Sequence, residues 1–265
     1  MKRYLSIYAE CVKTAIAKAL TYRLNFLLSL AITIGYNALF PLVSILIYRS
    51  GSSFPGWDFY EVLLMQSIFI LSQGFASMMF NNVLWTTMQH IREGSFEIVL
   101  LKPLNPLFFL VASNFDPESI GLIIGGGFLF AFSLSQTGID AAAAGYAVVI
   151  AQFLLLFAAG FSVMAGMNMI MAATSFKWVG NSRIPEIFDS VMTFGKYPVT
   201  VFPKVIQGIA AFVIPVSMIG FFPAAALLGK LEPSALLAVI PCVVFMVFGI
   251  WLYSRMVKLY EGAGG

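Results

Sequence analysis

Long stretches without a charged residue dominate this 265-residue sequence. Six of them are apolar and close to the length of about 20 residues that a helix needs to cross a bilayer: residues 24–48, 62–88, 119–135, 141–173, 205–228 and 234–254. Only 10% of all residues are charged, whereas a soluble domain carries about 25%. We therefore expect an all-α, polytopic membrane protein with six transmembrane helices. Soluble enzymes, nucleic-acid-binding proteins and disordered linkers are excluded.

The first 23 residues follow a different pattern. Apolar side chains such as Leu5, Tyr8 and Val12 fall on one face of a helix, and polar ones such as Glu10 and Lys13 fall on the other. This pattern predicts an amphipathic helix that lies along the membrane interface. We therefore expect an interfacial helix at residues 1–23, followed by a six-span domain at residues 24–265.

Lysine and arginine are distributed unevenly between the two sides of the predicted spans. With the N-terminus inside, only Arg49 and Lys230 of the 15 basic residues lie outside, which leaves thirteen inside. Loops on the cytoplasmic side carry an excess of Lys and Arg. Both ends of the chain are therefore predicted to be cytoplasmic.

An alternative arrangement concerns residues 174–204, which are too polar for a regular span and too aromatic for an ordinary loop. A short span at 187–201 would make residues 205–228 a re-entrant hairpin entered from outside, with broken backbone that protein must bury. Lys196 and Lys204 would then move outside, so that eleven basic residues lie inside and four outside. Both versions keep six segments and the same ends.

The sequence contains no complete ATP-binding motif. The two Gly-Lys pairs, at Lys196 and Lys230, lack the first glycine of a phosphate-binding loop, because Ser190 and Ala224 stand there. Any ATP chemistry must therefore come from a partner chain, and we expect no cofactor and no metal site in this one. The spans also lack the carboxylate, His or Lys that proton-coupled carriers place within the membrane.

The predicted cytoplasmic loop at residues 89–106 mixes charged with large apolar residues, and its end carries Pro103 and Pro106. Such a segment can present an amphipathic face to a soluble partner. A solvated loop with leucines turned toward the membrane is equally compatible with the sequence.

Several short motifs resemble, in their order and spacing, the membrane subunits of ABC exporters of the type-2 class, and within that class the daunorubicin-resistance-like permeases. The motifs are Gly94, residues 100–106 (LLKPLNP), Tyr197-Pro198, Phe202-Pro203, Pro215, Phe222-Pro223, Leu228-Gly229, Trp251, Arg255, Tyr260 and Gly262.

The resemblance implies a permease subunit in the cell membrane that is not itself an enzyme. It would pair with a second copy or a sister permease, and residues 89–106 would contact a separate ATPase that binds ATP and Mg. It also implies that residues 1–23 form a connecting helix and that residues 198–229 are re-entrant. Carried over to this sequence, the contact residues are Arg92, Glu93, Gly94, Phe96 and Lys102. The sequence alone leaves a stand-alone channel or an ion-coupled carrier as the alternative.

Polar residues form one stripe on each of the first two predicted spans. The stripes are Gln66, Gln73, Ser77 and Asn81 on the second span, and Ser29, Thr33, Asn37 and Ser44 on the first. The four residues of the second span lie within about 80° of one another on a helix. Each residue can simply form an interhelical hydrogen bond, worth about 0.6 kcal/mol. Together, the two stripes predict a translocation path.

Overall fold

The computed structural model describes residues 2–140, 145–178 and 183–260. Within these residues every regular element is a helix, apart from an isolated bridge between Phe54 and Trp57. Five helices are long and apolar enough to cross a membrane: Arg23–Arg49, Phe59–Arg92, Pro117–Thr137, Tyr146–Thr174 and Ala235–Val257. The expected all-α, polytopic fold is therefore confirmed.

Several of these long helices are joined from shorter ones. In chain order the helices are α1 (Lys2–Thr21), α2 (Arg23–Asn37), α3 (Leu39–Arg49), α4 (Phe59–Ala76), η1 (Ser77–Asn81), α5 (Asn82–Arg92), α6 (Phe96–Leu100), α7 (Pro106–Ser113), η2 (Pro117–Ser119), α8 (Ile120–Thr137), α9 (Tyr146–Thr174), α10 (Arg183–Phe194), η3 (Val199–Val201), α11 (Lys204–Gly208), η4 (Ile209–Val213), η5 (Val216–Met218), α12 (Phe221–Leu227), η6 (Pro233–Ala238) and α13 (Val239–Val257).

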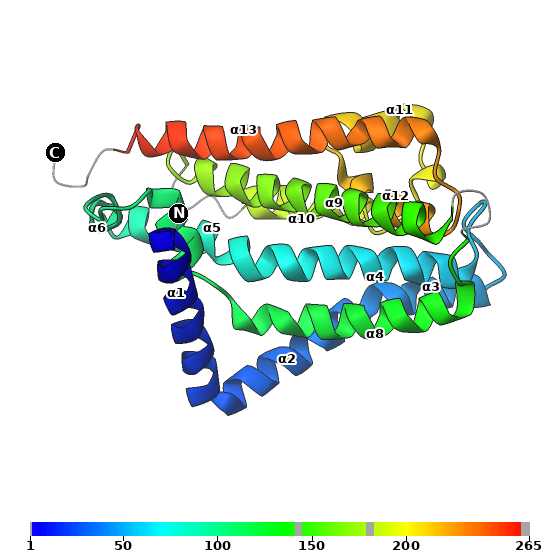
Figure 1. Ribbon diagram of the computed structural model, residues 1–265, viewed down its shortest axis with the longest axis horizontal. Coiled ribbons are helices and arrows are strands. Elements are labelled where there is room, and N and C mark those ends of the chain that lie inside the picture. Colours follow the sequence, from blue (N-terminus) through cyan, green and yellow to red (C-terminus); the bar gives the residue numbers. More distant parts are fainter. Residues whose placement is uncertain (1, 141–144, 179–182, 261–265) are drawn as a thin grey trace.

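The α4 helix occupies the centre of the bundle, between α8 and α9 (Figure 1). All of residues 62–70 are buried, including Gln66 and Ser67, because other helices surround them. The α2 and α13 helices instead expose many leucine, isoleucine and valine side chains. A helix that is apolar all round and exposed on one side suits a lipid-facing position.

Glycines allow the central helices to pack closely. A Cβ atom on Gly249 of α13 would lie 2.6 Å from the carbonyl oxygen of Gly166 on α9. Between α4 and α8, a Cβ atom on Gly74 would lie 2.9 Å from Leu122. Van der Waals packing is a main force between helices in lipid, so these close crossings stabilise the bundle.

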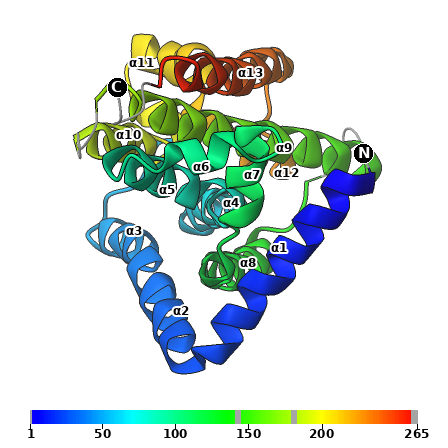
Figure 2. The ribbon, with the colours of Figure 1, turned by 90° about the vertical axis from the view of Figure 1, so that its left-hand side faces the viewer.

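The N-terminal amphipathic helix is present as α1. It crosses the end of the bundle at a steep angle to the long helices, and none of its residues is buried (Figures 1 and 2). Tyr4 packs edge-on against Phe108, with ring centroids 4.7 Å apart, and Tyr8 packs against Phe115 at 6.4 Å. This position suits a helix that lies along a membrane interface.

The start of α1 and the end of α13 lie at the same end of the bundle, beside α6 (Figure 1). This end carries Arg92 and Arg255 at the ends of their helices, whereas Asp58 and Glu61 mark the start of α4 at the opposite end. We term them the cytoplasmic end and the outer end, because basic residues gather on the cytoplasmic side of membrane proteins.

The segment predicted as the fifth span, residues 205–228, begins and ends at the outer end. Its two arms, Lys204–Val213 and Val216–Leu227, are bent by 76° and are termed the outer hairpin. Just before the hairpin, Thr200 donates a hydrogen bond to the carbonyl oxygen of Pro55 (3.5 Å). Just after it, Lys230 donates to the carbonyl oxygen of Gly56 (3.0 Å).

The second arm of the outer hairpin reaches into the bundle. The Ser72 hydroxyl donates to the carbonyl oxygen of Ile219 (3.2 Å), and Ser72 lies about 20 Å along α4 at 1.5 Å per residue. The chain breaks at Pro215 into two arms that are each too short to span, so residues 205–228 do not form the single regular helix that the simple prediction expects. The geometry agrees with the re-entrant alternative. The α10 helix leads from the cytoplasmic end toward the hairpin (Figure 1).

Candidate functional site

The turn between α5 and α6 is a helix cap built on Gly94. Gly94 has φ = 65°, and its N–H donates to the carbonyl oxygen of Ile91 (3.2 Å). The N–H of Ser95 donates to the carbonyl oxygen of His90 (2.9 Å). These two bonds form a Schellman motif, which favours glycine at the left-handed position. Gly94 therefore acts through the backbone and sets the direction of α6.

Phe96, at the start of α6, is fully buried. Its ring packs against Phe176, which follows α9, and against Tyr260, which follows α13, with centroid distances of 5.0 and 5.1 Å. We expected Phe96 at the partner contact, but its ring has no exposed surface to offer. It instead ties α6 to the cytoplasmic ends of the long helices.

The opposite face of α6 and the turn after it are exposed. Ile98 is 56% exposed and Leu101 is 84% exposed. Exposed charged residues surround these apolar side chains, so we term the set the α6 surface: Arg92, Glu93, Glu97, Ile98, Leu101 and Lys102. Apolar side chains ringed by polar ones are typical of protein interfaces. The contact residues carried over from the resemblance did not include Ile98 or Leu101, although the mixed pattern of residues 89–106 could have pointed to them.

A second candidate site is a cavity of about 270 Å³ between α4, α9 and α10, termed the central cavity. Its polar lining consists of Gln73, Ser77, Asn81, Asn168, Asp189, Thr193 and Lys196. Its apolar lining includes Tyr36, Phe40, Phe69, Phe188 and four methionines, Met164, Met167, Met171 and Met192. The cavity is thus polar on some walls and both apolar and adaptable on others, because methionine side chains repack easily.

A π-helical turn at Ser77–Asn81 interrupts the second span at this cavity. The carbonyl oxygen of Met78 accepts a hydrogen bond from the N–H of Asp116 in the loop before α8 (2.9 Å). Such turns are often found at functional sites. The π-helical turn does not change the apolar character of the span, so the hydrophobic pattern of the sequence could not reveal it.

The predicted stripe on the second span divides in two. Gln73, Ser77 and Asn81 line the central cavity. Gln66 lies nearer the outer end, where its amide donates to the Ser44 hydroxyl (2.9 Å) and to the carbonyl oxygen of Lys196 (3.3 Å).

The stripe on the first span lines no part of the central cavity. Asn37 donates to the carbonyl oxygen of Thr33 (2.9 Å) and borders a separate, mostly apolar space beside α8. Ser29 and Thr33 lie on the same helix, which packs along α8. The expectation that Ser29, Thr33 and Asn37 share one path with the second span is therefore not met. The first span contributes Tyr36 and Phe40 instead.

Lys196 brings a charge into the bundle where none was expected. Its ammonium lies 3.8 Å from the ring centroid of Phe40 and 5.6 Å from that of Phe69. The neighbouring Gly195 explains this position, since a Cβ atom there would lie 2.9 Å from both the Phe69 ring and the carbonyl oxygen of Val216. The outer hairpin thus holds this segment against α4.

A family model described as ABC-2 family transporter protein matches residues 31–264. The chain belongs to the ABC-2 transporter family. It is therefore a membrane component of a transporter. No curated protein and no solved structure gives a match.

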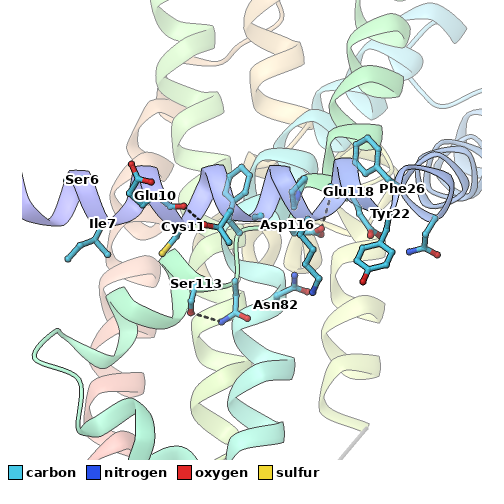
Figure 3. Close-up of a pocket in the computed structure, with 18 residues that line it drawn as sticks. Ser6, Ile7, Glu10, Cys11, Tyr22, Phe26, Asn82, Ser113, Asp116 and Glu118 are labelled. Atoms are coloured by element: carbon cyan, nitrogen blue, oxygen red, sulfur yellow. Dashed lines mark hydrogen bonds between the residues drawn. The ribbon is translucent and has the colours of Figure 1, made fainter.

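In this ABC-2 protein a groove of about 720 Å³ separates α1 from residues 113–118 (Figure 3). Glu10 and Cys11 border it from α1, and Asp116 borders it from the loop. The Asp116 carboxylate accepts hydrogen bonds from the N–H of Glu118 (3.1 Å) and the hydroxyl of Ser119 (2.7 Å). Beside the groove, Phe115 of this loop packs against Tyr8 of α1, and the N–H of Asp116 bonds to the π turn. The loop therefore connects α1 to the wall of the central cavity.

Proposed function

We propose that this chain is the permease subunit of an ABC exporter in the cell membrane, driven by a separate ATPase subunit. Family membership supports a membrane transport component. ATP and Mg would be bound by the partner, because the sequence lacks a phosphate-binding loop. A second copy or a sister permease would complete the transporter. Membership of the daunorubicin-resistance-like branch stays a prediction.

The observation that carries the proposal is the division of α6 into a buried face and an exposed face. Ile98 and Leu101 are available to a partner, whereas Phe96 is locked between Phe176 and Tyr260. A partner that displaces α6 would therefore move the ends of α9 and α13 with it. Rigid-body motion of this kind is an established way to switch between two global states.

The central cavity is the proposed translocation site. On α4 and η1 it extends from Phe69 to Asn81, and the second arm of the outer hairpin contacts α4 at Met65 and Ser72. The hairpin thus lies on the outer side of the cavity. We propose that it is the outer gate and that substrate enters from the cytoplasmic half.

The ATPase contact can be tested with Leu101→Asp in the tagged, full-length chain. A charge at the centre of an apolar contact removes buried area and leaves an unpaired carboxylate, so we expect about a tenfold or greater loss of the copurifying ABC ATPase. The measurement is quantitative mass spectrometry of the purified complex. Glu232→Lys, an exposed change at the outer end, is the matched control.

Full ATPase recovery with Leu101→Asp would contradict the assigned contact. Substrate transport by the chain reconstituted without any ATPase would contradict the proposed function and favour a stand-alone channel or ion-coupled carrier.

A further inference from the structure

Two polar groups of the central cavity lack partners among the residues that the structure describes. The Lys196 side chain is half-buried, and its ammonium lies against the faces of Phe40 and Phe69 with no hydrogen-bond acceptor and no carboxylate within ion-pair distance. The Oε1 atom of Gln73 is buried and receives no hydrogen bond. A buried acceptor such as Gln73 Oε1 is rarely left in this state, because an unmade hydrogen bond costs free energy.

We propose that the central cavity binds an amphiphile with an anionic head group, and that Lys196 selects for the charge. An anionic oxygen would accept hydrogen bonds from the Lys196 ammonium, and a hydroxyl or amine on the same head group would donate to Gln73. This inference rests on the proposed function, since it names the substrate class of the proposed translocation site.

The aromatic lining argues against a cationic substrate. Phe40 and Phe69 could attract a cation through their ring faces, but the Lys196 ammonium already occupies that position. The only carboxylate among the lining residues, Asp189, is exposed and acts on Lys196 through space without forming an ion pair with it. The charge nearest to the aromatic wall is therefore positive, and it complements an anion.

The apolar lining argues for a substrate larger than a small inorganic anion. Met164, Met167 and Met192 line the cavity beside Phe188. Methionine side chains are flexible and polarizable, so they can pack against acyl or other apolar chains of different shapes. A free phosphate or sulfate ion would make no apolar contacts with these methionine and phenylalanine side chains.

Binding can be tested with radiolabelled dodecyl phosphate and the purified, full-length chain in phosphatidylcholine nanodiscs, without ATPase or nucleotide. We expect saturable binding that dodecanol and dodecyltrimethylammonium do not displace at equal concentration. Inorganic phosphate should compete at least about tenfold more weakly than unlabelled dodecyl phosphate. Equal displacement by dodecanol would overturn charge selection, and equal displacement by inorganic phosphate would overturn the amphiphile.

Variants assign the binding to the cavity. Lys196→Met should weaken binding about tenfold or more, since hydrogen bonds to charged groups are worth that much, whereas Lys196→Arg should stay within about threefold. Lys204→Met, at the start of the outer hairpin and outside the cavity, is the control. Unchanged binding by Lys196→Met with an unaltered Tm would overturn the proposal. Because no ATPase is present, this failure is distinguishable from failure of the ATPase contact.

Discussion

At the scale of single residues, the conformation of Gly94 decides where the α6 surface lies. Its positive φ reverses the chain after α5, and the hydrogen bond between Ser95 and His90 holds the reversal in place. Arg92 and Glu93 precede this turn and lie exposed beside α6. The contribution of Arg92 and Glu93 to a partner contact therefore depends on the backbone conformation of Gly94, which need not itself touch the partner.

Gly94→Ala tests this role of the backbone. An L residue in the left-handed region costs about 1 kcal/mol or more, so we expect a lower Tm and reduced recovery of the ATPase. Gly127→Ala is the control, because a Cβ there meets nothing within 4 Å and its φ is not positive. A Gly94→Ala protein with unchanged Tm and full ATPase recovery would show that the left-handed turn is not required.

At the scale of elements, an ion pair fastens the outer hairpin to α4. The Lys230 ammonium lies 2.6 Å from Oε2 of Glu61 and 5.4 Å from the ring centroid of Trp57. Glu61 is itself held, because the same oxygen accepts a hydrogen bond from the N–H of Asp58 (2.8 Å) in a capping box. The ion pair thus joins two elements that are distant in sequence.

A double-mutant cycle of Glu61→Gln and Lys230→Met measures this connection. Gln can still accept from the N–H of Asp58, so the change removes the charge and largely preserves the cap. We expect each single variant to lower the free energy of unfolding and the pair to show a coupling of about 1 kcal/mol. Lys204→Met should show no coupling to Glu61→Gln. Strictly additive effects would mean that the ion pair does not stabilise the hairpin.

At the scale of the whole molecule, the sides of the membrane follow from the two ends of the bundle. The ends of the described chain and α6 lie together at one end (Figure 1), while Glu61, Lys230 and the start of the outer hairpin lie at the other. This arrangement predicts that Lys204 lies outside, as in the re-entrant alternative and against the simple hydropathy count.

Single cysteines in a chain that lacks Cys11 and Cys242 test this arrangement. A membrane-impermeant maleimide added to intact cells should label Lys204→Cys, and it should leave Lys258→Cys unlabelled until the membrane is opened. Both positions are exposed, so access to solvent is not limiting. Labelling of both or neither from outside would contradict a cytoplasmic C-terminus combined with a re-entrant hairpin.

Some parts of the site were predictable because they depend on local patterns. The helical spacing of apolar and polar residues predicts α1, and the helical spacing of Gln73, Ser77 and Asn81 predicts that they face one way. The positions of Phe96 and Lys196 were not predictable in the same way. Phe96 is buried by Phe176 and Tyr260, more than 75 residues away in sequence, and no local pattern contains that contact.

The sequence by itself determined the membrane class, the apolar helices and the bias of basic residues to one side, because the cost of a charge in lipid acts on every residue separately. Only the tertiary structure decided that residues 204–227 form two short arms bent at Pro215, that part of the second-span stripe meets α9 and α10, and that Lys196 lies among aromatic rings. These features depend on which helices pack together. Hydropathy measures transfer into lipid, and it does not distinguish a lipid-facing helix from one that protein surrounds.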